Sequence, residues 1–155
     1  MLPDTEMLAD DELRISRDLD APPELVFRLW TDPVHVVRWM GPDGFDCPSF
    51  ELDLREGGAW RGCIRSAEYG ENWMSGVYRE IIPGRRLVFT FAWDDGPETL
   101  VTIDFEALDG GRTRQTFHQT PFETVETRDS HVGGWASAFD CEAGYLEQIA
   151  KGADR

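Results

Sequence analysis

The stretch RRLVFTFAWDDGPETLVTIDFEALDGGRTRQTFHQ, residues 85–119, decides the fold class. Apolar residues alternate with polar ones along three runs, and a turn containing Gly or Pro separates each run from the next. This alternation is typical of strands with one buried face, and such short connections favour antiparallel neighbours. The stretch therefore predicts consecutive antiparallel strands over residues 85–93, 99–108 and 112–119.

Upstream of this stretch the same pattern continues. Residues 45–54, 59–65 and 73–82 also alternate, and Gly57-Gly58, residues 69–72 and Pro83-Gly84 provide the turns between them. An earlier run, residues 13–19, has the same period. We therefore expect seven strands.

Helical periodicity occurs in two places. Residues 20–23, with two prolines, supply an N-cap and the start of a helix. Asp32-Pro33 interrupts this helix and starts a short second one, which ends at Gly41-Pro42. Residues 129–150 form a long amphipathic pattern that must lie on the sheet. Small residues in its middle leave room for a cavity, although they equally suit close helix–sheet packing: Ala136, Ala138, Ala143 and Gly144.

Composition excludes several classes of protein. The 155 residues suit one domain and carry a formal net charge of −15, which repels phosphate backbones and anionic lipids. We read residues 1–12 as an acidic mobile tail and residues 13–151 as the domain. There is no apolar run long enough for a membrane span, and three scattered cysteines suit a reducing cytoplasm. We expect a cytoplasmic protein without nucleic-acid or membrane partners, and a homodimer only as a base-rate expectation.

A set of motifs, in order along the chain, carries a resemblance to a known family. In the first half these are Phe27-x-x-Trp30-Thr31-Asp32-Pro33, Trp39-Met40-Gly41-Pro42 and Asp53-x-Arg55-x-Gly57-Gly58-Ala59-Trp60. In the second half these are Gly76-x-x-x-Glu80-Ile81-x-Pro83, Leu87-Val88-Phe89-Thr90-Phe91 and Arg128-Asp129-Ser130-His131-x-x-Gly134-Trp135. Together they resemble the heat-shock-protein-90 ATPase activator homologue-like family of the SRPBCC (START-like) superfamily.

The resemblance implies an α+β helix-grip fold. Its curved seven-stranded antiparallel sheet wraps around the long C-terminal helix, with two short helices between the first and second strands. It also implies an apolar cavity between sheet and helix for a small hydrophobic or aromatic ligand. Two alternatives remain open: a cyclase or dehydratase-type enzyme using the same cavity, and a module that stimulates a chaperone ATPase.

The expected cavity wall combines the inward faces of the strands with the long helix. Gln115 and Gln119 are polar residues on an inward face, and buried amides need hydrogen-bond partners, so they either orient a ligand or bond water at the cavity mouth. The expected ligand-binding residues are Trp39, Trp60, Ile64, Phe89, Phe91, Trp93, Ile103, Phe105, Gln115, Phe117, Gln119, Trp135 and Phe139.

Catalytic and metal motifs are not found in the sequence, so we expect no cofactor and no metal. Tyr78 and Glu80 form an acid/base pair if both face the cavity, whereas an outward Glu80 would pair with a nearby arginine. His131 is the third catalytic candidate. A structural role suits it better, at the start of the last helix beside a capping Asp129 or Ser130.

Overall fold

The computed structural model describes residues 5–6 and 9–153. Eight strands form a single antiparallel sheet in the order β1-β2-β8-β7-β6-β5-β4-β3. The strands are β1 (Thr5–Glu6), β2 (Leu13–Leu19), β3 (Asp46–Leu52), β4 (Ala59–Ser66), β5 (Gly70–Ile82), β6 (Arg86–Trp93), β7 (Thr99–Leu108) and β8 (Arg112–Thr120). The helices are α1 (Pro23–Thr31), α2 (Pro33–Trp39) and α3 (Val125–Ala153).

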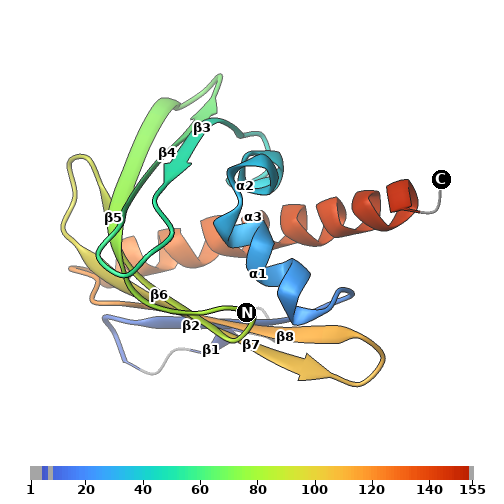
Figure 1. Cartoon of the computed structure of the whole chain (residues 1–155). Coiled ribbons are helices and arrows are strands. Elements are labelled where there is room, and N and C mark those ends of the chain that lie inside the picture. The colour runs from blue at the N-terminus through green and yellow to red at the C-terminus, as the bar shows by residue number, and fades with distance from the viewer. Residues whose placement is uncertain (1–4, 7–8, 154–155) are drawn as a thin grey trace.

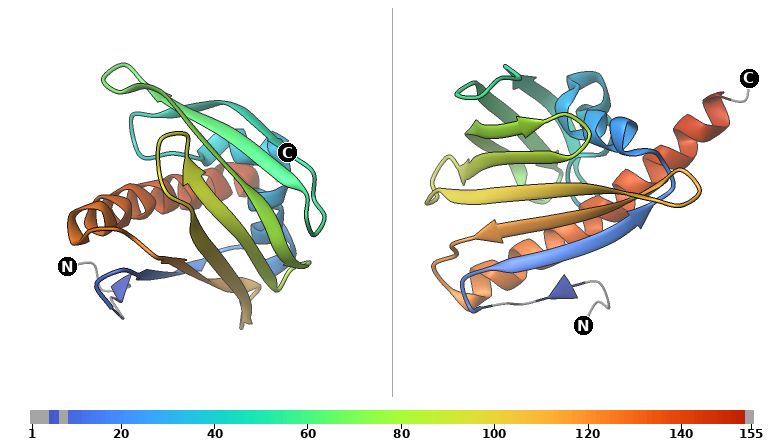
Figure 2. Two further views of the ribbon diagram at one scale, coloured as in Figure 1. Left: turned by 90° about the vertical axis from the view of Figure 1, so that its left-hand side faces the viewer. Right: turned by 60° about the horizontal axis from the view of Figure 1, so that its bottom comes forward.

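The sheet curves around the three helices, which all lie on its concave side (Figure 1). The C-terminal end of α3 runs past the edge of the sheet (Figure 2). This arrangement confirms the expected helix-grip fold, with all seven expected strands in place. The two-residue β1 is an addition, pairing Thr5 with Ile15 at the edge of the sheet.

Helix starts differ from those expected. Asp32 does cap α2, because its Oδ1 accepts a hydrogen bond from Val34 N at 3.0 Å. Pro22 is the N-cap of α1, without a side-chain hydrogen bond. α3 begins one turn earlier than expected. Thr124 Oγ1 accepts from Thr127 N at 3.1 Å, so neither Asp129 nor Ser130 is the cap.

Trp30 of α1 fills the centre of the space between the sheet and α3. It is 3% exposed, and its ring lies 4.9 to 6.4 Å from five other aromatic rings, measured between centroids. These belong to Trp39, Phe89, Phe117, Trp135 and Phe139. Aromatic pairs of this kind stabilise a fold by more than the burial of their surface area alone. The region where the resemblance implied a deep cavity is therefore packed with side chains.

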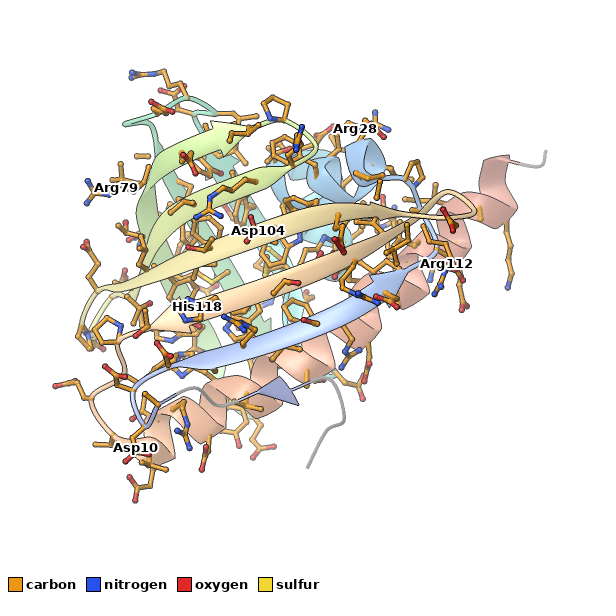
Figure 3. All side chains as sticks on the ribbon, turned by 90° about the horizontal axis from the view of Figure 1, so that it is seen from below. Asp10, Arg28, Arg79, Asp104, Arg112 and His118 are labelled. Carbon is orange, nitrogen blue, oxygen red and sulfur yellow. The ribbon has the colours of Figure 1, made fainter. Side chains whose placement is uncertain are left out.

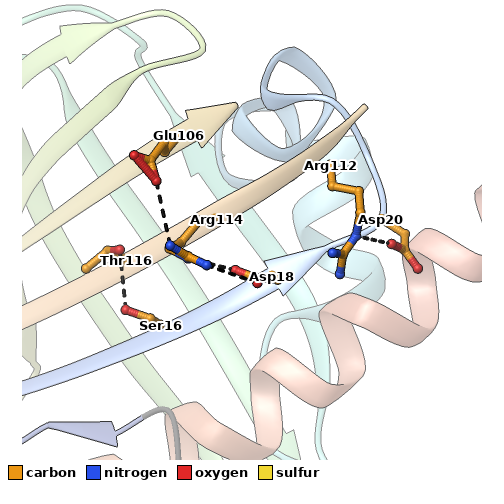
Figure 4. A network of polar contacts seen from close by, with 7 residues as sticks. All are labelled: Ser16, Asp18, Asp20, Glu106, Arg112, Arg114 and Thr116. Carbon is orange, nitrogen blue, oxygen red and sulfur yellow. Dashed lines mark hydrogen bonds and ion pairs between the residues drawn. The ribbon is translucent and has the colours of Figure 1, made fainter. Parts of the chain in front are cut away.

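The outer face of the sheet is covered by charged and polar side chains, among them Asp104, Arg112 and His118 (Figure 3). Ion pairs connect neighbouring strands: Arg114 of β8 lies between Asp18 of β2, at 2.9 Å, and Glu106 of β7, at 3.9 Å (Figure 4). Exposed pairs of this kind contribute about 0–1 kcal/mol each. Their main consequence is that they favour this strand register over a one-residue slip.

Candidate functional site

An open cleft of about 430 Å³ lies at one end of the space between sheet and α3. Its walls come from the α2–β3 connection, from β4, β5 and β6, and from the N-terminal half of α3. It is lined by Met40, Gly41, Pro42, Phe45, Ile64, Tyr69, Asn72, Met74, Phe91, Trp93, Ser130, His131, Gly134, Trp135 and Ala138. This volume is in the range of small-molecule sites.

Local sequence explains the shape of the α2–β3 wall. Gly41 has φ 114°, and a Cβ at this position would lie 3.1 Å from Phe45 Cβ, so only glycine suits the turn. Asp43 N donates to Ser137 Oγ at 2.8 Å, which ties the connection to α3. Pro42 lies opposite Gly134, and the missing side chain of Gly134 keeps the cleft open between them.

A second, much smaller space lies deeper in the molecule. This inner hollow has a volume of about 20 Å³, room for about one water molecule. It is lined by Trp30, Met40, Phe50, Trp60, Met74, Tyr78, Leu87, Phe89, Phe91 and Trp135. In its present conformation it cannot take a ligand, so the cleft is the candidate site.

No Asp, Glu, Lys or Arg lines the cleft among the residues that the structure describes. This is notable in a chain of which 29% is charged. The aromatic residues also keep their polar atoms engaged elsewhere: Trp93 Nε1 donates to His131, and Trp135 Nε1 donates to Gln119. The cleft therefore offers aromatic faces and apolar edges, with Asn72 and Ser130 as polar groups.

His131 has both ring nitrogens engaged. Nδ1 lies 2.8 Å from Thr127 O, to which it can only donate, and Nε2 then accepts from Trp93 Nε1 at 3.1 Å. This assigns the neutral Nδ1–H tautomer. Burial lowers the pKa of His131, while the bond to Thr127 acts in the opposite direction. The imidazole thus positions Trp93 at the cleft.

Tyr78 and Glu80 do not form an acid/base pair. Tyr78 pairs with Phe89 and Glu80 with Val88, so a β-bulge at Arg79 inserts one extra residue between them. Tyr78 is 2% exposed and lines the inner hollow. Glu80 lies on the outer face, where its Oε1 is 2.6 Å from Arg86 Nε. The alternation that placed both residues on one face was interrupted by the bulge.

Gln115 and Gln119 are buried, and both side chains hydrogen-bond to other protein groups. Gln115 accepts from Trp30 Nε1 at 2.9 Å and donates to Glu142 Oε1 at 3.0 Å. Gln119 accepts from Trp135 Nε1 and donates to Thr99 Oγ1, both at 2.9 Å. Each amide orients a tryptophan indole, and neither lines the cleft.

Glu142 of α3 is a buried carboxyl that the sequence reading overlooked. Its side chain is fully buried, and its Oε2 has no hydrogen-bond partner within the described part of the chain. Burial raises its pKa to about 8, although the bond from Gln115 and the charge of Arg17 act in the opposite direction. Glu142 is therefore protonated at neutral pH.

The structure divides the expected ligand-binding residues into three groups. Ile64, Phe91, Trp93 and Trp135 line the cleft; Trp60 and Phe89 line the hollow together with Phe91 and Trp135. The remaining residues are buried and line neither space: Trp39, Ile103, Phe105, Gln115, Phe117, Gln119 and Phe139.

Several lining residues were missed by the sequence reading. One group belongs to the family motif Trp39-Met40-Gly41-Pro42, and its lining members are Met40, Gly41 and Pro42. The sequence could not show that this loop lies over α3. Gly134 and Ala138 are small residues four apart on α3, a spacing that puts them on one helix face. That spacing was the available signal.

None of the helices in residues 5–6 and 9–153 has the length and apolar character needed to cross a bilayer. Within the same residues, His, Cys, Asp and Glu side chains do not gather in groups of three or more that could hold a metal ion.

Comparison with known proteins places the chain in a family. Residues 20–147 match the family described as activator of Hsp90 ATPase homolog 1-like protein. Among proteins with curated descriptions, none matches.

Solved structures agree with this match. A protein of Chromobacterium violaceum is 30% identical, with 86% of this chain and 96% of that chain covered and a TM-score of 0.77. The AHSA1 protein of Silicibacter pomeroyi is 27% identical, with 89% and 99% covered and a TM-score of 0.78. A Rhodobacter sphaeroides protein, 23% identical over 93% and 97% of the two chains, shares the fold with a TM-score of 0.80. The chain belongs to the activator of Hsp90 ATPase homolog 1-like family.

Proposed function

We propose that this protein binds a small, uncharged, mostly aromatic or apolar molecule in the cleft between β4–β6 and α3. The observation that carries the proposal is the lining: an open cleft of about 430 Å³ with mostly aromatic and apolar walls and no charged residue among the described ones. A charged ligand would lose its hydration beside such walls without gaining an ion-pair partner, which costs free energy. Transfer of an apolar ring from water to the cleft is favourable. Phe91, Trp93 and Trp135 supply the ring contacts.

The test compares a neutral probe with a charged one of similar shape. We expect 2-acetylnaphthalene to raise the melting temperature with increasing dose, since a ligand that binds only the folded state stabilises it. The anion 2-naphthoate should give a much smaller shift at the same concentration. Equal shifts for both probes, or none for either, would contradict the proposal.

Two neighbouring glycines of α3 offer a matched pair of variants. Gly134 faces the cleft, and the nearest atom to an added Cβ is Pro42 Cγ at 3.8 Å, so Gly134→Leu fills the cleft without a backbone clash. Gly133 is exposed and has no atom within 4 Å of an added Cβ. We expect at least a tenfold loss of 2-acetylnaphthalene affinity in Gly134→Leu and unchanged affinity in Gly133→Leu, measured by calorimetry.

Stimulation of a chaperone ATPase is the second candidate, and the family match over residues 20–147 favours it. The measurement is the ATPase rate of Hsp90 from the same organism with and without this protein. A rise in rate that Gly134→Leu leaves intact would assign the activity to a surface other than the cleft. The enzyme alternative has less support, because Tyr78 and Glu80 lie on opposite faces of β5.

A further inference from the structure

Most side-chain nitrogen and oxygen atoms that line the cleft already bond to other protein groups. This holds for Tyr69, whose hydroxyl is bonded to the adjacent Glu68, and for the ring nitrogens of Trp93, His131 and Trp135. Two polar side chains of the lining remain, Asn72 on β5 and Ser130 on α3. A polar group of a ligand in the cleft can therefore meet one of these two.

Asn72 lies on the inner face of the sheet, near the start of β5. It pairs with Ile64 of β4, and residues directly opposite each other on neighbouring strands share a face of the sheet. Ile64 and Met74, two residues further along β5, line the cleft together with Asn72. The half-buried Asn72 side chain is thus part of the wall that the sheet contributes.

The β4–β5 turn holds the Asn72 amide in one orientation. Its Nδ2 donates to two carbonyl oxygens of this turn, Tyr69 O and Gly70 O, both at 3.3 Å. Turning the amide over would place Oδ1 against these two oxygens, where no hydrogen bond can form. Nδ2 therefore faces the turn. Oδ1, on the other branch of the planar amide, is directed away from it and accepts no hydrogen bond within the described part of the chain.

Asn72 and Ser130 differ in how they can select a ligand. The Ser130 hydroxyl is exposed, rotates, and both donates and accepts, so it suits ligand donors and acceptors alike. Asn72 offers only an acceptor. A ligand hydroxyl can bond Oδ1, whereas a ligand of the same shape without a donor covers this oxygen, separates it from solvent and leaves it unpaired.

We propose that Asn72 determines which neutral ring compounds the cleft prefers, by accepting a hydrogen bond at Oδ1 from a hydroxyl group on the ring. This inference rests on the proposed function and adds to it a ligand class, an uncharged molecule of the phenol type. The ring lies against Phe91, Trp93 and Trp135, and its hydroxyl reaches Asn72.

The test compares 2-naphthol with 2-methylnaphthalene, in which a methyl group replaces the hydroxyl, at pH 7, where the naphthol is uncharged. Calorimetry gives both affinities for the wild type and for Asn72→Leu, which has a similar size and no acceptor. We expect the ratio of the affinities, naphthol over methylnaphthalene, to fall about three- to tenfold in the variant, as the loss of one net hydrogen bond predicts. The comparison of ratios cancels the difference in hydrophobicity between the probes.

Two control variants separate the acceptor from its surroundings. Ser66→Ala removes the bond that Tyr69 N donates to Ser66 Oγ at 2.9 Å, so it loosens the same turn and leaves Asn72 in place. Ser130→Ala removes the other polar group of the cleft. Both should keep the wild-type ratio. A fall in either control as large as that in Asn72→Leu would overturn the assignment to Asn72.

A second measurement needs no variant that has to fold. In ¹H–¹⁵N spectra of the wild type, the side-chain amide signals of Asn72 should shift further with 2-naphthol than with 2-methylnaphthalene, since a hydrogen bond at Oδ1 polarises the whole amide. Equal shifts, or an unchanged ratio in Asn72→Leu, would overturn this inference and leave cleft binding intact. Failure of both probes to bind the wild-type protein would instead overturn the proposed function and this inference with it.

Discussion

Replacing Glu142 by glutamine should change how stability depends on pH. The carboxyl has an ordinary pKa of 4.5 when the chain is unfolded and about 8 when it is buried in the folded protein. The folded state therefore holds a proton that the unfolded state releases above pH 4.5, so stability is full below pH 4.5 and is lost as pH rises toward 8. Glu142→Gln removes this titration.

The magnitude follows from the two pKa values. At 1.36 kcal/mol for each unit, the difference between 4.5 and about 8 corresponds to about 5 kcal/mol over the whole range. By pH 7, about 3 kcal/mol of this is already lost. The glutamine side chain resembles the protonated acid, and its oxygen can still accept from Gln115. We therefore expect similar stabilities at pH 4.5 and a variant more stable by about 3 kcal/mol at pH 7.

The assay is urea unfolding at pH 5, 6, 7 and 8, followed by tryptophan fluorescence, for the wild type, Glu142→Gln and Glu147→Gln. Glu147 is exposed on the same helix and serves as the control, whose curve should run parallel to the wild type. The difference between Glu142→Gln and wild type should grow by about 1.4 kcal/mol for each pH unit between 5 and 7. A difference that stays constant with pH would refute the assignment of a buried, protonated carboxyl.

Three other variants test the packing around the site. Trp30→Phe should destabilise the fold by about 2–4 kcal/mol in urea unfolding, because it leaves a void and removes the donor to Gln115; a cost below 1 kcal/mol would contradict the central position of the indole. The wild-type protein should lose stability as pH falls below 6.5, because the pKa of His131 is lowered in the folded state and the unfolded state takes up the proton first. This loss should be smaller in His131→Gln, and parallel pH profiles of the unfolding free energy in the two proteins would contradict the expectation. Gly76→Ala should cost about 2–4 kcal/mol, since its Cβ would overlap a backbone carbonyl, whereas Gly133→Ala should be neutral or stabilising by up to about 1 kcal/mol.

The strand meander was predictable because its signal is local. Each run of alternating residues lies between turns that need glycine or proline, and the expected range of 99–108 agrees with β7 residue for residue. The bulge at Arg79 was not predictable in this way. A bulge inserts one residue without leaving a clear mark in the alternation, and it is the reason that Tyr78 faces inward while Glu80 faces Arg86 on the outside.

The contents of the space between sheet and helix depend on residues distant in sequence. Alternation correctly placed Phe89, Ile103 and Phe117 on the inner face, and all three are buried. It could not predict which of them meets a cavity, because that depends on where Trp30 of α1 comes to rest. Trp30 fills the centre, and the open space is displaced to the end near Trp93.

By itself the sequence determined the strand and helix order, the formal net charge of −15, and the inward set of apolar residues, because these follow from periodicity, turn chemistry and charge along the chain. Tertiary structure alone decided the partners of the buried polar groups and the position of the cleft. Gln115 and Glu142 lie 27 residues apart, and Trp30 and Gln115 lie 85 apart. A buried polar group must find a hydrogen-bond partner, but only the folded chain brings that partner within reach.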